Sequence, residues 1–341
     1  MDTSQRLAVI GCGRMGQRHV AVFQSLGFTN IAICDTRQDA LHNVGTHCGL
    51  SEHHCFTNAH RLLSSFCPTI LVVATTAPSH CELSCLAIEC GVRYVICEKP
   101  LACSIAECEQ MIATCNRLGA HLAVNHQVRY MPAYALAKQI IDSSEFGNFT
   151  SMTVAGGNGG LAMIGSHLFE AFRWLTGERV DTVQAWLSSE KVPNPRGAEF
   201  EDYGGCIRAL TPSGKRLYVD LSADQGHNLT IVYSGRFGQV IVEPLAGEIR
   251  SSVRKADDRH QPTTRYATAG ERHIATFDPL ALEASQALIR DLISGRGFPT
   301  GEDGKHAVEC LIATHLSHEN GHIPIRLAEL EPFKNRKFRW A

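Results

Sequence analysis

The first third of the chain alternates short apolar runs with amphipathic stretches. The apolar runs lack the polar alternation of a half-exposed strand, so they predict strands buried on both faces of a parallel sheet. A glycine or a helix-capping residue bounds most of the amphipathic stretches, as Ser104 and Glu107 do at capping-box spacing. Strands alternating with helices predict an α/β domain with helices on both faces of the sheet. The predicted strands span 6–10, 30–34, 69–74, 93–97 and 121–125, and helices are predicted after Gly16 and at 79–89 and 104–118.

Beyond residue 148 the pattern changes to short segments in which apolar and polar positions alternate, which is typical of strands with one exposed face. Turn residues such as those at 211–214 separate these segments. The stretch 256–273 has much charge and little periodicity, and we expect it to run over the surface. Strands are predicted at 149–155, 181–187, 204–210, 216–222, 228–233 and 239–243, and helices at 280–293 and 305–318.

Composition narrows the class of protein. A chain of 341 residues with 44% hydrophobic and 19% charged residues is expected to fold into two domains. The 32 Lys and Arg against 34 Asp and Glu give a net charge of −2, which favours neither nucleic acid nor an anionic membrane as a partner. No apolar run approaches the length that spans a bilayer, and the polar start is unlike a signal peptide.

The 14 cysteines are the unusual feature of the composition, and all but Cys206 and Cys310 lie before residue 116. A disulfide framework is typical of small secreted chains, so we expect reduced thiols and a cytoplasmic protein. Cys81 and Cys85 lie one helical turn apart, but the chain has no CxxC pair, so we predict no metal.

Two further clusters are interpreted as non-functional. His315, His318 and His322 are spaced to share one helical face, but Gly321 predicts a helix end and no acid or thiol completes a metal shell. The basic run 334–339 is expected to be a solvated tail.

The first predicted strand ends in a glycine fingerprint. Gly11 permits the tight turn, Gly13 lets the backbone approach a pyrophosphate, and Gly16 lets helix and strand pack closely. The following helix N-terminus would offer N–H groups to that pyrophosphate. The fingerprint predicts a dinucleotide site that also includes Cys12, Arg14 and Met15.

The second predicted strand closes on Asp35, which follows Gly16 by 19 residues. A carboxylate here would accept hydrogen bonds from the adenosine ribose and repel a 2′-phosphate, which favours NAD over NADP. Arg37 weakens this preference, because an arginine could stack on adenine or reach a phosphate.

Glu98 and Lys99 follow another predicted strand, at the edge where open parallel sheets bind ligands. A lysine there can donate to a substrate hydroxyl. From the residues alone, an exposed loop salt bridge is the better explanation of the pair.

The chain resembles the Gfo/Idh/MocA oxidoreductases, which include glucose–fructose oxidoreductase and inositol dehydrogenases. The resemblance implies a Rossmann domain at 1–124, then an α/β domain at 125–341 with an open, mostly antiparallel sheet, and it leaves room for the closing helices to pack back on the first domain. It also implies a homodimer or homotetramer, since the outer face of that sheet commonly forms a subunit interface. The matching motifs are 11–16 with His19, 75–80, 98–101, 125–130 with Pro132 and Tyr134, 165–167, 174–177 and 301–304.

The resemblance also implies roles for individual residues. Lys99 would hold and polarise the substrate oxygen, and His167 would act as the general base while hydride leaves the same carbon for NAD. The remaining cofactor contacts would come from Thr75, Thr76, His80 and Glu98, and the remaining substrate contacts from Asn125, Gln127, Arg129, Tyr130, Asn158 and Met163.

Met163 departs from the family pattern, because many members carry an aspartate four residues before the histidine. A methionine can neither accept nor orient a proton. Glu170, one turn after His167, is a candidate to orient the imidazole instead.

Three functions remain open from the sequence. The first is an NAD-dependent dehydrogenase that oxidises a secondary hydroxyl of a sugar, cyclitol or nucleotide-linked sugar. The second is redox-neutral, glycosidase-like chemistry with retained NAD, which Met163 favours. The third is a non-catalytic dinucleotide-sensing regulator, which the presence of both Lys99 and His167 disfavours. Thiol oxidation is expected to inhibit if Cys12 or Cys97 is accessible, with NAD protecting.

Overall fold

A computed structural model describes residues 2–157, 159–262, 270–278 and 282–340. Within it the chain forms two compact units. The first consists of Met1–Gln127, Leu282–Val308 and Phe333–Ala341, and the second of Val128–Ala281 and Glu309–Pro332. The first unit therefore extends three residues beyond the expected boundary at 124 and includes two later segments of the chain.

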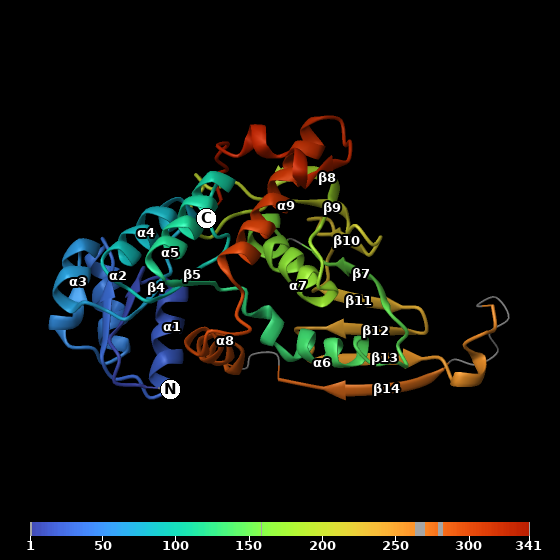
Figure 1. The fold of residues 1–341 in the computed structure, drawn as a ribbon, viewed down its shortest axis with the longest axis horizontal. Coiled ribbons are helices and arrows are strands. Elements are labelled where there is room, and N and C mark those ends of the chain that lie inside the picture. The colour runs from blue at the N-terminus through green and yellow to red at the C-terminus, as the bar shows by residue number, and fades with distance from the viewer. Residues whose placement is uncertain (1, 158, 263–269, 279–281, 341) are drawn as a thin grey trace. The chain divides into compact units, whose positions relative to one another are not determined.

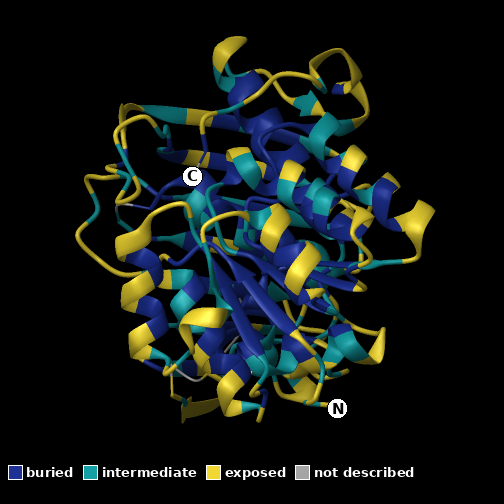
Figure 2. Ribbon diagram, turned by 90° about the vertical axis from the view of Figure 1, so that its left-hand side faces the viewer, coloured by how far each residue is buried: buried dark blue, intermediate teal, exposed yellow. Residues whose placement is uncertain are grey.

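The first unit is built on a six-stranded parallel sheet in the order β3-β2-β1-β4-β5-β6. Its four central strands are buried along their whole length, as their continuous apolar sequences predict (Figure 2). This is the predicted doubly wound domain. The strands are β1 Leu7–Ile10, β2 Ile31–Cys34, β3 Cys55–Phe56, β4 Ile70–Val73, β5 Tyr94–Cys97 and β6 His121–Val124.

Helices connect these strands and a later helix joins them (Figure 1). Ser104 caps α5 as predicted, since its side chain accepts from the N–H of Glu107. The free edge of β6 is covered by a returning segment, where the N–H of Val124 donates to the carbonyl of Pro299 at 2.8 Å. The helices are α1 Arg14–Ser25, α2 Gln38–His47, α3 Ala59–Phe66, α4 His80–Glu89, α5 Ile105–Leu118 and α8 Glu283–Ser294.

The second unit contains a nine-stranded sheet in the order β14-β13-β12-β11-β7-β10-β9-β8-β15. All neighbouring pairs are antiparallel except β7 with β10. Strands such as β10 and β11 alternate buried and more exposed positions, and the pairing confirms the predicted mostly antiparallel sheet. They are β7 Phe149–Ala155, β8 Thr182–Lys191, β9 Tyr203–Leu210, β10 Arg216–Asp220, β11 Thr230–Gly235, β12 Gly238–Glu243, β13 Glu248–Val253, β14 Glu271–Thr276 and β15 Ile325–Arg326.

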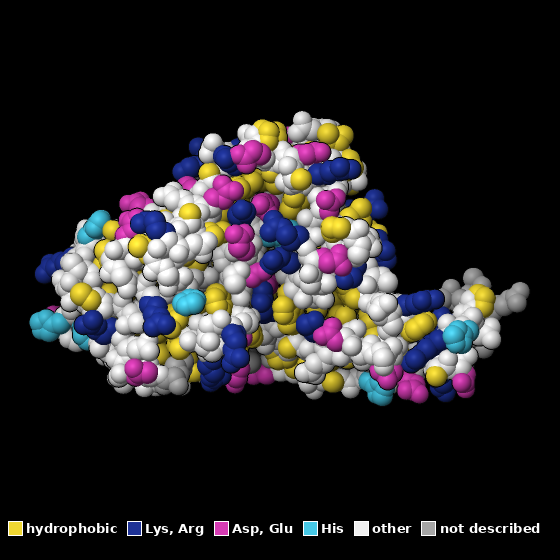
Figure 3. All heavy atoms as spheres, in the orientation of Figure 1, with side chains coloured by type: hydrophobic (Ala, Val, Ile, Leu, Met, Phe, Trp, Pro, Cys, Tyr) yellow, Lys and Arg dark blue, Asp and Glu magenta, His cyan; other side chains and the backbone are white. Residues whose placement is uncertain are grey.

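Helix α6 (Pro132–Ile141) packs against β11, β12 and β13, and a π-helical turn at Leu161–Gly165 leads directly into α7 (Ser166–Thr176). The long helix α9 (Gly301–Glu319) contributes residues to both units. On the face seen in Figure 3, basic and acidic side chains are interspersed. No helix in the described ranges is long and apolar enough to cross a bilayer.

Two expectations about surface segments need correction. The expected excursion at 256–273 ends in β14, which pairs with β13 along its full length; residues 263–269 lie outside the described part of the chain. The predicted solvated tail instead packs on the first unit. The N–H of Phe338 donates to the carbonyl of Cys103 at 3.0 Å, and Trp340 is only 2% exposed.

Candidate active site

The glycine turn after β1 has the geometry of a phosphate cradle. Gly11 has φ +100°, and a Cβ there would lie 2.6 Å from the backbone of Ala74. A Cβ on Gly16 would lie 1.8 Å from the carbonyl oxygen of Gly11, so only glycine lets α1 approach the turn this closely. Gly13 is exposed at the N-cap of α1, whose first N–H groups have no side-chain cap. These free N–H groups and the open space beside Gly13 fit a pyrophosphate.

Asp35 follows β2 and faces the same turn. Its carboxylate accepts from the N–H of Cys12 at 2.7 Å and from the N–H of Arg37 at 2.9 Å. The predicted acid is therefore fixed beside the glycine turn, with lone pairs left for ribose hydroxyls. The side chain of Arg37 is 65% exposed and lies 3.8 Å from Asp39. Arg14 is exposed and Met15 half-exposed in the first turn of α1.

Thr75 and Thr76 are half-exposed in the loop after β4. His80 is fully buried and bridges this loop to the next one, with Nε2 3.2 Å from the carbonyl of Thr75 and Nδ1 3.0 Å from that of Pro100. Burial lowers the pKa of His80, although the two carbonyls oppose this shift. His80 thus joins the loops after β4 and β5 rather than presenting a free side chain to a ligand.

Glu98 is buried at the end of β5 and anchors the loop that carries Lys99. Its Oε1 lies 2.8 Å from Nε2 of His19, on α1, and accepts from the side-chain amide of Asn125 at 2.7 Å. Burial alone would raise the pKa of Glu98, but the hydrogen bond and charge of His19, with Lys99 and Asn125, hold it at about 2. A buried carboxylate thus ties α1, β5 and the end of β6 together, and Lys99 is half-exposed beside it.

The residues that follow β6 were predicted to contact substrate. In the structure several of their polar groups form hydrogen bonds with other side chains of the protein. Asn125 is 2% exposed and donates to Glu98. Gln127 is 8% exposed, and its side-chain carbonyl accepts from the hydroxyl of Ser285 at 2.8 Å. Tyr130 is half-exposed. Their contact with substrate stays a prediction.

Arg129 belongs to the second unit and forms a buried ion pair with Glu170 on α7. The guanidinium also lies 5.9 Å from the ring centre of Trp174. Burial raises the pKa of Glu170 despite the nearby charge of Arg129. Oε2 of Glu170 has no hydrogen-bond partner, so Glu170 does not orient His167 as the sequence suggested. It instead holds Arg129 against α7.

Met163 and His167 are both half-exposed among largely buried neighbours, Met163 in the π turn and His167 in the first turn of α7. The third predicted residue of this region, Asn158, lies outside the described part of the chain. The π turn is capped from a distance by Asp202, which sequence reasoning missed because no local motif marks it.

The thiols near the cofactor turn are less reactive than expected. Cys12 is 5% exposed, and burial with the nearby charge of Asp35 raises its pKa to about 12. Cys97 is fully buried, and burial likewise raises its pKa. The expected inhibition depended on accessibility, and both thiols lack it. No cluster of metal-ligating side chains occurs among the described residues.

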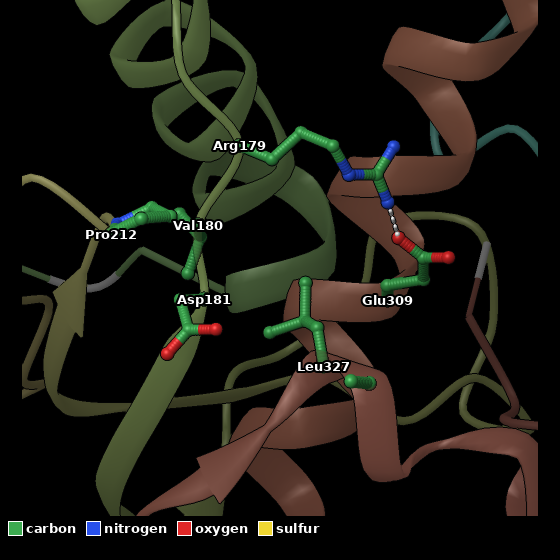
Figure 4. A pocket seen from close by; sticks show the side chains of 7 residues that line it. Arg179, Val180, Asp181, Pro212, Glu309 and Leu327 are labelled. Atoms are coloured by element: carbon green, nitrogen blue, oxygen red, sulfur yellow. Dashed lines mark hydrogen bonds and ion pairs between the residues drawn. The ribbon is translucent and has the colours of Figure 1, made fainter.

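A cavity of about 380 Å³ lies in the second unit (Figure 4). Arg179 and Glu309 point toward one another across its upper side and form an ion pair, while Asp181 faces the cavity from the start of β8. None of the predicted site residues lines it.

Comparison with known proteins agrees with this geometry. Residues 5–126 match the model of the GFO_IDH_MocA family, described as an oxidoreductase family with an NAD-binding Rossmann fold. The first unit of the chain therefore matches the NAD-binding domain of the Gfo/Idh/MocA oxidoreductases. The matched residues include the glycine turn, Asp35 and Lys99.

Relatives of this protein extend over nearly the whole chain. A D-apiose dehydrogenase of Paraburkholderia graminis is 29% identical over 95% of this chain and 90% of its own. An inositol 2-dehydrogenase of Serratia proteamaculans is 24% identical over 97% of this chain and 99% of its own. An oxidoreductase from Agrobacterium radiobacter, solved with NAD+, L-tartaric acid and magnesium, has a TM-score of 0.81 at 19% identity and covers 96% of this chain and 99% of its own. At that identity the structural likeness concerns the fold.

Proposed function

We propose that this protein is an NAD-dependent dehydrogenase that oxidises a secondary hydroxyl of a sugar, cyclitol or nucleotide-linked sugar. The observation that carries the proposal is the first unit's combination of an open phosphate cradle with a half-exposed Lys99 held by the Glu98 anchor. The D-apiose and inositol dehydrogenases among its relatives support this substrate class.

In the proposed mechanism, NAD would supply the hydride acceptor when bound. The turn formed by Gly11, Gly13 and Gly16 would hold its pyrophosphate, and Asp35 would bind the adenosine ribose, which favours NAD over NADP. Lys99 donates a hydrogen bond to the substrate oxygen and stabilises its developing negative charge. His167 takes the proton of the same hydroxyl, so the carbon loses a hydride while the oxygen loses a proton.

The glycine turn, Asp35 and Lys99 belong to the first unit, whereas His167 belongs to the second, and each set of residues is fixed by the packing within its own unit. Glu98 and its partners fix Lys99. The ion pair of Arg129 with Glu170 fixes α7. We assign contact with substrate to Tyr130 and Met163 as well, because both side chains are half-exposed.

The test is a turnover screen that follows NADH formation across sugars, cyclitols and nucleotide sugars. Lys99→Ala and His167→Asn are each expected to lower kcat by about 100-fold or more, because removal of a general base or an oxyanion donor costs that much. The Kd for NADH, followed by fluorescence, should stay within a few-fold of wild type in His167→Asn. Full activity of His167→Asn would exclude it as the base.

Met163 favours one second candidate, redox-neutral chemistry with retained NAD, because the usual aspartate is missing. Product formation without net NADH, by protein that purifies with bound NAD, would select this alternative. A regulator is distinguished by Lys99→Ala, which would leave partner binding intact.

We further propose a cytoplasmic homodimer or homotetramer. In the described part of the chain the 14 cysteines form no disulfide, which is typical of a reducing compartment. The outward face of the nine-stranded sheet carries Trp186, 46% exposed, beside a groove also lined by Cys206 and Tyr218. Light scattering of the purified protein tests the assembly.

A further inference from the structure

The buried carboxylate of Asp202 binds the start of the π turn from the chain segment just before β9. Its Oδ1 accepts from the N–H of Ala162 at 2.9 Å and its Oδ2 from the N–H of Met163 at 3.0 Å. The N–H of Tyr203 donates to Oδ1 as well, at 3.0 Å, and Asp202 is only 3% exposed. A carboxylate that accepts several N–H groups at a helix start is held in one orientation.

Gly160 is what allows this approach. A Cβ at that position would lie 2.0 Å from Oδ2 and 2.3 Å from Cγ of Asp202. The glycine and the carboxylate therefore form a matched pair, one on each side of the same contact. The carbonyl of Gly160 in turn accepts from the N–H of Ile164 at 2.8 Å, which closes the turn.

The π turn runs without a break into α7, so its start sets the direction of the helix that carries His167. Met163, Ile164 and His167 are half-exposed, while Ala162, Gly165 and Ser166 are buried. The hydroxyl of Ser166 donates to the carbonyl of Ala162 at 3.0 Å and links turn and helix. A shift of the two capped N–H groups would therefore move the imidazole.

We propose that Asp202 is the positioning residue for His167. It places a carboxylate on the backbone of Met163, four residues before His167. The proposal rests on the proposed function only in giving His167 a catalytic role. Asp202 acts through the turn, and we assign it no contact with substrate.

The test compares three full-chain variants. Asp202→Asn replaces one acceptor oxygen with an amide that cannot accept, and Gly160→Ala displaces the intact carboxylate from the other side. Glu178→Gln is the matched control, because Glu178 also binds a backbone N–H, of Ser213, and a lysine, Lys215, in the same unit. It should lose stability without any effect on His167.

Three readouts separate positioning from general stability. Hydrogen exchange of the amides of Ala162 and Met163 should become at least tenfold faster in Asp202→Asn and in Gly160→Ala. The imidazole NMR signal of His167, assigned by its loss in His167→Asn, should shift in both variants and stay unchanged in Glu178→Gln. With a substrate from the turnover screen, kcat should fall at least tenfold while the Kd for NADH stays within twofold.

Unchanged exchange at the two amides, or faster exchange with an unmoved His167 signal, would overturn the proposal. An equal shift of the His167 signal in Glu178→Gln would overturn it too, because the effect would then follow from stability alone. Failure of the proposed function appears separately, as full activity of His167→Asn. In that case exchange and the imidazole signal still decide whether Asp202 positions the residue.

Discussion

Substitution by alanine should affect different properties at the two glycines at the start of α1: stability at Gly16 and affinity for NADH at Gly13. In Gly16→Ala the new Cβ would lie 1.8 Å from the carbonyl oxygen of Gly11, against an ordinary contact of about 3.4 Å. Helix and turn would have to separate by roughly 1.6 Å, and neither partner is a flexible side chain. Overpacking of this kind costs about 3 kcal/mol. The usual gain of alanine over glycine inside a helix, about 1 kcal/mol, leaves a net loss near 2 kcal/mol.

Gly13→Ala meets nothing within 4 Å, and its φ of −79° and ψ of −171° are open to any residue. Its stability should fall by at most about 1 kcal/mol, the cost of alanine at an N-cap. The added methyl group would instead occupy the space assigned to the pyrophosphate. We expect the Kd for NADH to rise at least tenfold, which corresponds to about 1.4 kcal/mol.

Urea denaturation measures the first effect and NADH fluorescence titration the second. A Gly16→Ala protein as stable as wild type would show that the close contact in the turn is not required. Wild-type affinity of Gly13→Ala for NADH would remove the pyrophosphate from this turn. The reasoning also fails if Gly13→Ala is the less stable of the two.

Three further outcomes are expected. The pKa of Glu98 is about 2 in the folded protein against 4.5 for the free side chain, a difference that contributes about 3 kcal/mol to the free energy of unfolding. This contribution is present above pH 4.5 and is lost as the pH falls toward 2. Urea denaturation across this range should therefore show a flatter pH dependence in Glu98→Gln than in wild type. Trp340→Ala should lower the free energy of unfolding by about 3 kcal/mol or more, whereas Phe333→Ala, at a side chain 38% exposed, should cost little in the same assay. Iodoacetamide followed by mass spectrometry should label the exposed Cys67 well before Cys12.

Local sequence patterns were sufficient to predict most of the secondary structure of the first unit. The buried strands, the glycine turn and the cap at Ser104 each depend on neighbours in sequence, and the predicted ends of the strands differ from the observed ones by about one residue. Helices α2 and α3 were not predicted, and both pack against β2 and the edge strand β3.

The site was only partly predictable for a related physical reason. A motif can place Glu98, Asn125 and Arg129 near the carboxyl ends of strands. It does not show which of their polar atoms bind other protein groups and which are left for a ligand. That depends on contacts between residues far apart in sequence, such as His19 with Glu98 and Asp202 with Met163.

The docking of the last residues on the first unit has a consequence for how the protein is made. Cys103 and Ala106, near the start of α5, exchange backbone hydrogen bonds with Phe338 and Lys334, and the buried Trp340 completes the packing there. A ribosome synthesises these partners long after α5. The cofactor-binding unit therefore reaches its final packing only after synthesis of the second unit, and a fragment ending at residue 124 would leave this surface and the edge of β6 uncovered.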